Sequence, residues 1–121
     1  MLDQELKRAS AIVTLSGEID LTNSEGAYDQ LYAAFASGAP VVIADFTATT
    51  FCDCSSLSGL LDVQQRLAEG NAQLRLAIPP GTAVSRVAQL IGLDHRLPVY
   101  PSLDEAASSP RPAAPAGWAA A

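Results

Sequence analysis

The sequence is poor in positive charge. Seven Lys and Arg residues stand against 13 Asp and Glu residues, which gives a net charge of -6. The few basic residues are scattered, whereas binding to the phosphates of nucleic acids requires clustered Lys and Arg. We therefore expect no nucleic-acid partner.

Metal ligands and reactive groups are also sparse. Cys52 and Cys54 are the only cysteines and His95 is the only histidine, which is too few ligands for a structural zinc site. The cysteine pair does not indicate an oxidising compartment. There is no G-x-G-x-x-G motif or P-loop lysine, and no base is in evidence to activate Cys54 as a nucleophile. We expect no cofactor, no metal and no enzymatic activity.

Long apolar runs are missing as well. No run reaches the roughly 20 residues of a membrane-spanning helix, and the charged start MLDQELKRAS is unlike a secretory signal. We expect a cytoplasmic protein without a membrane partner. At 121 residues, the length favours one domain. The composition changes at Ser108, so we predict a domain over residues 1–107 and a disordered Pro/Ala-rich tail over 108–121, in which Trp118 is the one notable side chain.

Strands and helices alternate along the domain, which predicts an α/β fold with a mixed, largely parallel sheet and helices mostly on one face. The continuous β-branched run Val41–Asp45 predicts a strand buried on both faces. The alternating run Gln73–Ile78 predicts a half-buried strand. The remaining strands are expected at Gln4–Lys7, Ala11–Leu15 and, as an edge strand containing Pro98, Leu97–Tyr100.

Helices are expected between these strands. The first has Tyr28, Leu31, Tyr32 and Phe35 on one face, and either Thr22 or Asn23 can cap its start. The second begins near Ser55 and ends at Glu69. A third follows Thr82 and is closed by Gly92, and a short terminal helix is capped by Ser102.

The segment TFCDCSSLSG (Thr50–Gly59) lies at a predicted strand-to-helix junction. A hydroxyl or thiol at a helix start is well placed to carry a phosphate, because free amide groups and partial positive charge gather there. The alternative is simple capping by Asp53 or Ser55. The strand-end carboxylates of Asp20, Asp45 and Asp53 likewise suit metal or acid–base chemistry, or turns and caps.

Over roughly residues 4–107 the sequence resembles the STAS domains of bacterial anti-sigma-factor antagonists. Four segments carry the resemblance in the family's order and spacing: LSGEID (Leu15–Asp20), VVIADF (Val41–Phe46), FCDCSSLSGLL (Phe51–Leu61) and IGLDHRLPVY (Ile91–Tyr100). The resemblance implies a STAS-type fold with about four helices and no catalytic activity. It also implies an anti-sigma factor partner that is a serine kinase, and release of a sigma factor by partner switching.

In such proteins the kinase phosphorylates the serine directly after the motif aspartate. Matching that motif to Asp53 places Cys54 at the acceptor position and Ser55 at the second serine. Phosphorylation of Ser55, constitutive binding without a switch, and oxidation of Cys54 all stay open.

The resemblance also implies a partner-binding surface formed by Asp20, Asp53, Ser56, Leu57 and Ser58. Ser56 and Ser58 stand where the family prefers glycine, and we expect Ser56 to be exposed at the helix start, where Ser56→Arg would leave the fold intact. The chain is expected to be a monomer or weak dimer. The alternative function is a STAS-type structural or regulatory subunit of a transport or lipid-trafficking complex.

Overall fold

A computed structural model describes residues 10–110 of the chain. The predicted strand Gln4–Lys7 and most of the predicted tail, with Trp118, lie outside these residues. The strands are β1 (Ser10–Thr14), β2 (Gly17–Ile19), β3 (Val41–Asp45), β4 (Thr49–Cys52), β5 (Gln73–Ala77) and β6 (Val99–Tyr100). The helices are α2 (Ser24–Ala36), α3 (Cys54–Ser58), α4 (Leu60–Glu69), α5 (Ala83–Leu90), the 3-10 helix η1 (Leu93–His95) and α6 (Leu103–Ser108).

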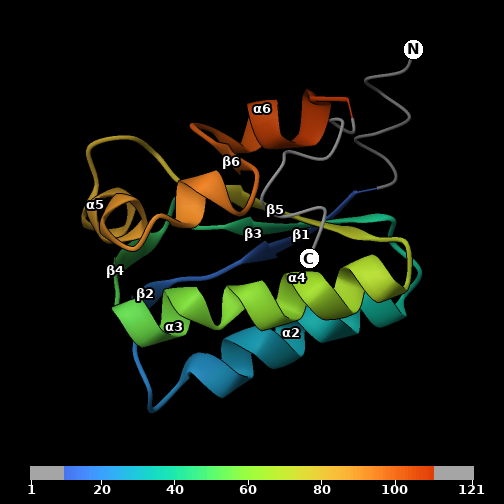
Figure 1. The fold of residues 1–121 in the computed structure, drawn as a ribbon, viewed down its shortest axis with the longest axis horizontal. Helices are drawn as coiled ribbons and strands as arrows, with labels where there is room; N and C mark the ends of the chain where they lie inside the picture. Colours follow the sequence, from blue (N-terminus) through green and yellow to red (C-terminus); the bar gives the residue numbers. More distant parts are fainter. Residues whose placement is uncertain (1–9, 111–121) are drawn as a thin grey trace.

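The main sheet has four parallel strands in the order β1-β3-β5-β6 (Figure 1). The prediction of an α/β fold with a largely parallel sheet is confirmed, and β3 is buried along its whole length as expected. Each successive strand of this sheet is added on the same side of the previous one. Right-handed crossovers then place the connecting helices on one face of the sheet.

The two faces of the sheet are covered differently. Leu31 of α2, Leu67 of α4 and Val84 of α5 share one apolar cluster with the strands. On the opposite face, α6 is the only helix among residues 10–110, and its Ala106 joins Ile43 in a smaller cluster. Figure 1 shows α2 and α4 below the sheet and α6 above it. The expectation that helices mostly cover one face is therefore confirmed. No helix within residues 10–110 is long and apolar enough to span a membrane.

The prediction that β5 is half-buried was wrong. All of its residues are buried, including Gln73 and Arg75. The Arg75 guanidinium donates hydrogen bonds from Nε to Gln73 Oε1 (2.8 Å) and from Nη1 to the carbonyl oxygens of Ala106 (2.7 Å) and Ser109 (2.8 Å). The polar alternation of β5 therefore serves to bind α6, and does not mark a solvent-facing side.

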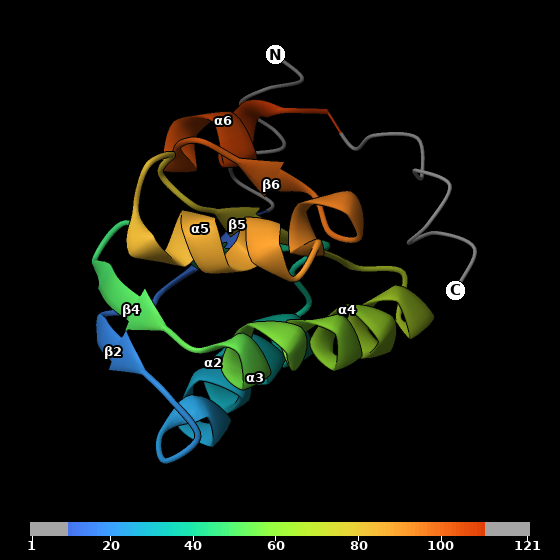
Figure 2. The same cartoon turned by 60° about the vertical axis from the view of Figure 1, so that its left-hand side comes forward.

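A second, two-stranded sheet pairs β2 with β4 in parallel. Neither strand was predicted. Figure 2 shows the two strands side by side, apart from the main sheet, with the chain passing from β4 directly towards α3. Glu18 lies opposite Phe51 and Ile19 opposite Cys52, and the Asp53 N–H donates to the Ile19 carbonyl (3.1 Å). The pairing of β2 with β4 therefore brings the segments Leu15–Asp20 and Phe51–Leu61 together.

The helix ends match the predictions in part. Ser102 caps α6 by accepting the Glu105 N–H (3.1 Å), and the second predicted helix ends at Glu69 as expected. Asn23 occupies the N-cap position of α2, but the expected side-chain cap is absent. The Asn23 side chain instead accepts the Asp20 N–H (3.0 Å) and donates to the Glu18 carbonyl (2.9 Å), so it fixes the turn between β2 and α2.

Candidate partner-binding site

Asp53 joins β4 to α3 and caps the helix. Its backbone is extended, and its Oδ1 accepts the Ser56 N–H at 2.8 Å. The Leu57 N–H donates to the Asp53 carbonyl (3.1 Å), which closes the first turn. Such a cap satisfies an amide that the helix itself leaves unpaired. The capping interpretation of Asp53 is confirmed, and this cap fixes the direction in which the next side chains point.

Asp20 follows the neighbouring strand β2 and holds a turn in the same way. Its carboxylate accepts hydrogen bonds from the hydroxyl and the backbone N–H of Thr22. These bonds, that of the hydroxyl first, lower the pKa of the Asp20 carboxyl from its ordinary value. Asp45 accepts the Thr47 N–H (3.0 Å) in a further turn. Within residues 10–110, no group of three His, Cys, Asp or Glu side chains is placed to hold a metal ion.

The outer side of the junction carries the groups that can be modified. Cys54, Ser55 and Ser58 are exposed, and Cys54 and Ser55 are the first two residues of α3. Cys52, by contrast, is only 2% exposed. Burial raises the pKa of its thiol to about 12, and the charges of Asp53 and Cys54 add to this shift. Both cysteines are free thiols. Cys54, Ser55 and Ser58 are therefore the thiol and hydroxyl groups of this junction that a modifying reagent or enzyme can reach.

The inner side of the junction is closed. Ser56 is 2% exposed and Leu57 is fully buried, so the expectation of an exposed Ser56 was wrong. The Asp53 cap turns the third residue of α3 towards the core. The Ser56 hydroxyl has no hydrogen-bond partner among the residues that the structure describes. Ser56 and Leu57 support the site from below and are not accessible to a partner.

Tyr28 of α2 holds this inner side in place, a role that its position on the apolar helix face did not reveal. Its hydroxyl donates to the Ser56 carbonyl at 2.6 Å. Desolvation raises the pKa of the Tyr28 hydroxyl, and the charges of Cys52, Asp53 and Asp62 act in the same direction. The phenol lies against Gly59, where a Cβ atom would stand 2.1 Å from the tyrosine oxygen. The second predicted helix is interrupted at this glycine, between α3 and α4.

The accessible residues of the site form what we term the junction surface: Asp20, Asp53, Cys54, Ser55 and Ser58. Two large apolar side chains border it and were missed from the sequence. Leu21 is 72% exposed and Phe51 is 41% exposed. The burial of β4 does not alternate, since Thr50 and Phe51 are both exposed between the buried Thr49 and Cys52, so the sequence carried no periodic signal for Phe51.

Comparison with known proteins identifies the family to which the chain belongs. The family model described as the STAS domain matches residues 3–106. The chain belongs to the STAS domain family. A Mycobacterium tuberculosis protein that carries the name anti-anti-sigma factor is 34% identical over 101 residues, which cover 81% of this chain and 67% of that protein.

Solved structures agree with the STAS assignment. The crystal structure of an anti-sigma factor antagonist from Mycobacterium paratuberculosis has a TM-score of 0.68 at 28% identity, covering 81% of this chain and 82% of the other. A Thermotoga maritima structure has a TM-score of 0.69 at 18% identity, with coverage of 81% and 84%. At that identity the second match shows the fold alone. The predicted STAS-type fold is therefore confirmed.

Proposed function

We propose that this STAS domain is an anti-sigma factor antagonist, which binds an anti-sigma factor and thereby frees a sigma factor. The observation that carries the proposal is the 34% identity over 101 residues to a relative named for this function. The absence of catalytic motifs from the sequence accords with action by binding alone. We place the complex in the cytoplasm and the free chain as a monomer or weak dimer.

The junction surface is the contact region in this proposal. It is held rigidly, because Asp20 and Asp53 fix the turns that follow two paired strands. Rigid presentation lowers the entropic cost of binding. The exposed Leu21 and Phe51 beside it supply the apolar contacts that the centre of a protein interface requires.

The proposed partner is an anti-sigma factor of the serine-kinase type, with Ser55 as the phosphate acceptor. Ser55 is exposed at the second position of α3, next to the capping carboxylate of Asp53. A phosphate there adds close to two negative charges at the centre of the contact surface. Docking would then be weakened by the change of charge and by the added bulk. Cys54 stands where the family carries its acceptor, and a thiol is a poor substitute for a hydroxyl in phosphoryl transfer.

Two other states of the switch are alternatives to phosphorylation of Ser55. Without a phosphate acceptor the chain binds constitutively. With oxidation of Cys54, a sulfenic acid or thiol adduct takes the place of the phosphate. No observation on residues 10–110 favours the alternative function as a subunit of a transport or lipid-trafficking complex.

The function is tested by mixing the purified chain with each anti-sigma factor from the same genome, alone and bound to its sigma factor. We expect one anti-sigma factor to bind the chain on a sizing column and to release its sigma factor as the chain is added. If none binds, the antagonist function is wrong.

The phosphate acceptor is tested separately with the partner that binds. Wild type, Ser55→Ala and Cys54→Ser are incubated with this partner and ATP, and the phosphate is located by mass spectrometry. We expect label on wild type that is lost in Ser55→Ala. Label retained in Ser55→Ala would contradict the assignment to Ser55. Label found only in Cys54→Ser would show that the cysteine abolishes the switch.

A further inference from the structure

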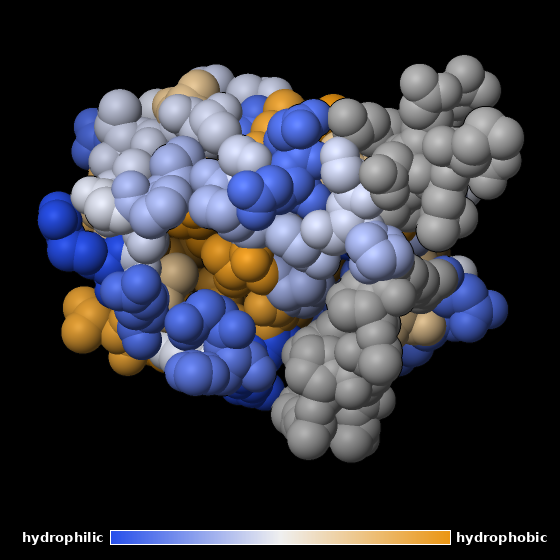
Figure 3. Space-filling view, turned by 90° about the horizontal axis from the view of Figure 1, so that it is seen from above, coloured by the Kyte–Doolittle hydropathy of each residue, from blue (hydrophilic) through white to orange (hydrophobic). Residues whose placement is uncertain are grey.

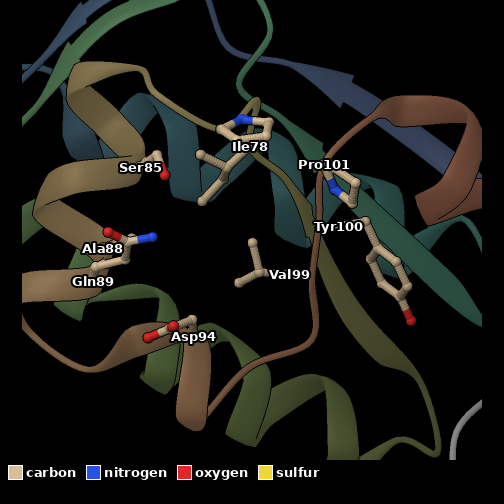
Figure 4. Close-up of a pocket in the computed structure, with 9 residues that line it drawn as sticks. Ile78, Ser85, Ala88, Gln89, Asp94, Val99, Tyr100 and Pro101 are labelled. Atoms are coloured by element: carbon tan, nitrogen blue, oxygen red, sulfur yellow. The ribbon is translucent and has the colours of Figure 1, made fainter.

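A hollow of about 370 Å³ opens between α5, η1 and β6, and no residue of the junction surface lines it. Its apolar part is formed by Ile78, Ala88 and Val99, and its polar part by Ser85, Gln89 and Asp94. Figure 4 shows Ile78 and Val99 pointing into the space, with the polar groups of Ser85, Gln89 and Asp94 around one side. Figure 3, which views the side of α6, shows an apolar hollow surrounded by more polar side chains.

The sequence explains why this space is not filled. Ser85, Ala88 and Gln89 are spaced i, i+3 and i+4, so they lie on one side of α5. Two of these three side chains are small and leave room in front of β6. Pro80 and Pro101 also line the hollow, and their fixed backbone angles stiffen its wall. The hollow is therefore preformed and does not need a rearrangement to open.

The charge of the lining selects one class of ligand. Asp94 is the only charged residue among the described residues that line the hollow, and it is exposed on η1. His95 and Arg96 follow it in the chain but do not line the space. An ionised carboxylate attracts a cation and repels an anion, and the net charge of -6 adds to this preference.

We propose that the hollow binds a small organic cation: a primary ammonium group on a compact apolar body. The ammonium group contacts Asp94, with Ser85 and Gln89 as further acceptors. The apolar body lies on Val99, over a floor formed by Ile78 and Ala88, which are 3% and 2% exposed. The volume falls within the range of small-ligand sites, which is roughly 300–1,000 Å³. This site is independent of the proposed binding of an anti-sigma factor.

The test is an NMR titration of the full-length, ¹⁵N-labelled chain at pH 7 with three probes that share one ring. The probes are phenethylammonium, the neutral 2-phenylethanol and the anionic phenylacetate. We expect saturable shifts of the Ser85, Gln89 and Val99 amides with phenethylammonium. Binding should be about threefold weaker for the alcohol, as for a solvent-exposed ion pair, and weaker again by a similar factor for phenylacetate. The preference for the cation should shrink at high salt.

Two variants and a control locate the site. Asp94→Asn should bring phenethylammonium down to the affinity of the alcohol, whereas Asp62→Asn on α4 should leave the threefold difference unchanged. Ser85→Leu should fill the hollow and weaken both probes.

The proposal is overturned by equal or tighter binding of phenylacetate, by shifts confined to other parts of the fold, or by equal effects of Asp94→Asn and Asp62→Asn. It is also overturned if phenethylammonium binds only after truncation behind Pro110. The occupant of the hollow would then be the chain's own C-terminal segment.

Discussion

The segment that leads from β4 into α3 has an inner and an outer side with the same kinds of residue. On the inner side, Cys52 and Ser56 are each 2% exposed. On the outer side, Cys54 and Ser55 are exposed. Residues two apart on a strand share a side, but the chain changes to a helix at Asp53 and separates Cys52 from Cys54. The change from strand to helix at Asp53 therefore decides which thiol and which hydroxyl are accessible. The residue types are the same on both sides and do not decide it.

The largest effect expected from this difference is on stability. Ser56→Arg places a charge in a closed space beside Leu57 and below Tyr28, and should cost about 3 to 5 kcal/mol of unfolding free energy, as for a buried unpaired charge. Ser55→Arg, one residue away, should change stability by less than about 0.5 kcal/mol. Urea unfolding followed by circular dichroism measures both.

Ser56→Ala is the matched control for that substitution. It removes a buried hydroxyl that has no partner among the described residues, so stability should change by less than about 1 kcal/mol. Similar stabilities of Ser56→Arg and Ser55→Arg would show that the inner side is open.

Gly59→Ala should have the next largest effect on the free energy of unfolding, and it should destabilise the domain where this substitution usually stabilises a helix. Gly→Ala in a helix normally stabilises by up to about 1 kcal/mol. Here the new Cβ would stand 2.1 Å from the Tyr28 hydroxyl, so the tyrosine must move and lose its bond to the Ser56 carbonyl. We expect a loss of about 1 to 3 kcal/mol.

A double-mutant cycle checks this cause. In a Tyr28→Ala background the ring is gone, and Gly59→Ala should be neutral or stabilising. A stabilising Gly59→Ala in the wild-type background would contradict the contact between Tyr28 and Gly59.

Substitutions of Asp53, which caps α3, should have a smaller effect on stability. Asp53→Ala leaves the Ser56 amide without its acceptor and should cost about 1 kcal/mol. Asp53→Asn keeps an acceptor oxygen and should lose clearly less. Thermal unfolding of both variants makes the comparison, and equal losses would mean that the negative charge, and not the cap, is what stabilises α3.

The two cysteines should differ in their reactivity towards alkylation in the folded wild-type chain. Iodoacetamide at pH 8 should label Cys54 in the folded chain and reach Cys52 only after unfolding, as peptide mass spectrometry can show. Folding raises the pKa of Cys52 from 9.0 to about 12. The stability that this thiol contributes is therefore complete below pH 9 and is lost as the pH rises towards 12. Early labelling of Cys52 would place it on the outer side.

Much of the main sheet could be predicted from the sequence. The bounds of β3 follow from its short, continuous run of mainly β-branched residues, and Ser102 was correctly expected to cap the terminal helix. The burial of Gln73 and Arg75 could not be predicted, because their alternation also fits a solvent-facing side. Only the position of α6 over β5 shows where those polar groups are satisfied.

The sequence located the segment that joins β4 to α3, but it did not show which of its side chains face the solvent. Asp53 and Ser55 were the two candidates for the cap, of which the structure shows Asp53, and the motif located Cys54 and Ser55. The short strands β2 and β4 were missed, since three or four residues carry too little periodicity to be seen alone. Unless β4 is recognised as a strand, the sequence does not show which side chains of residues 53–58 face the core. For this reason Ser56 was expected at the surface.

The most direct test of the central claim is the affinity of Ser55→Arg for the anti-sigma factor that binds the wild-type chain. If the outer side of the junction is the contact region, calorimetry should show a loss of at least about 2 kcal/mol, as for a hot-spot position. The variant should remain as stable as wild type, and the control Ser56→Ala should keep its affinity. Wild-type affinity in a folded Ser55→Arg would contradict the claim and place the contact elsewhere on the domain.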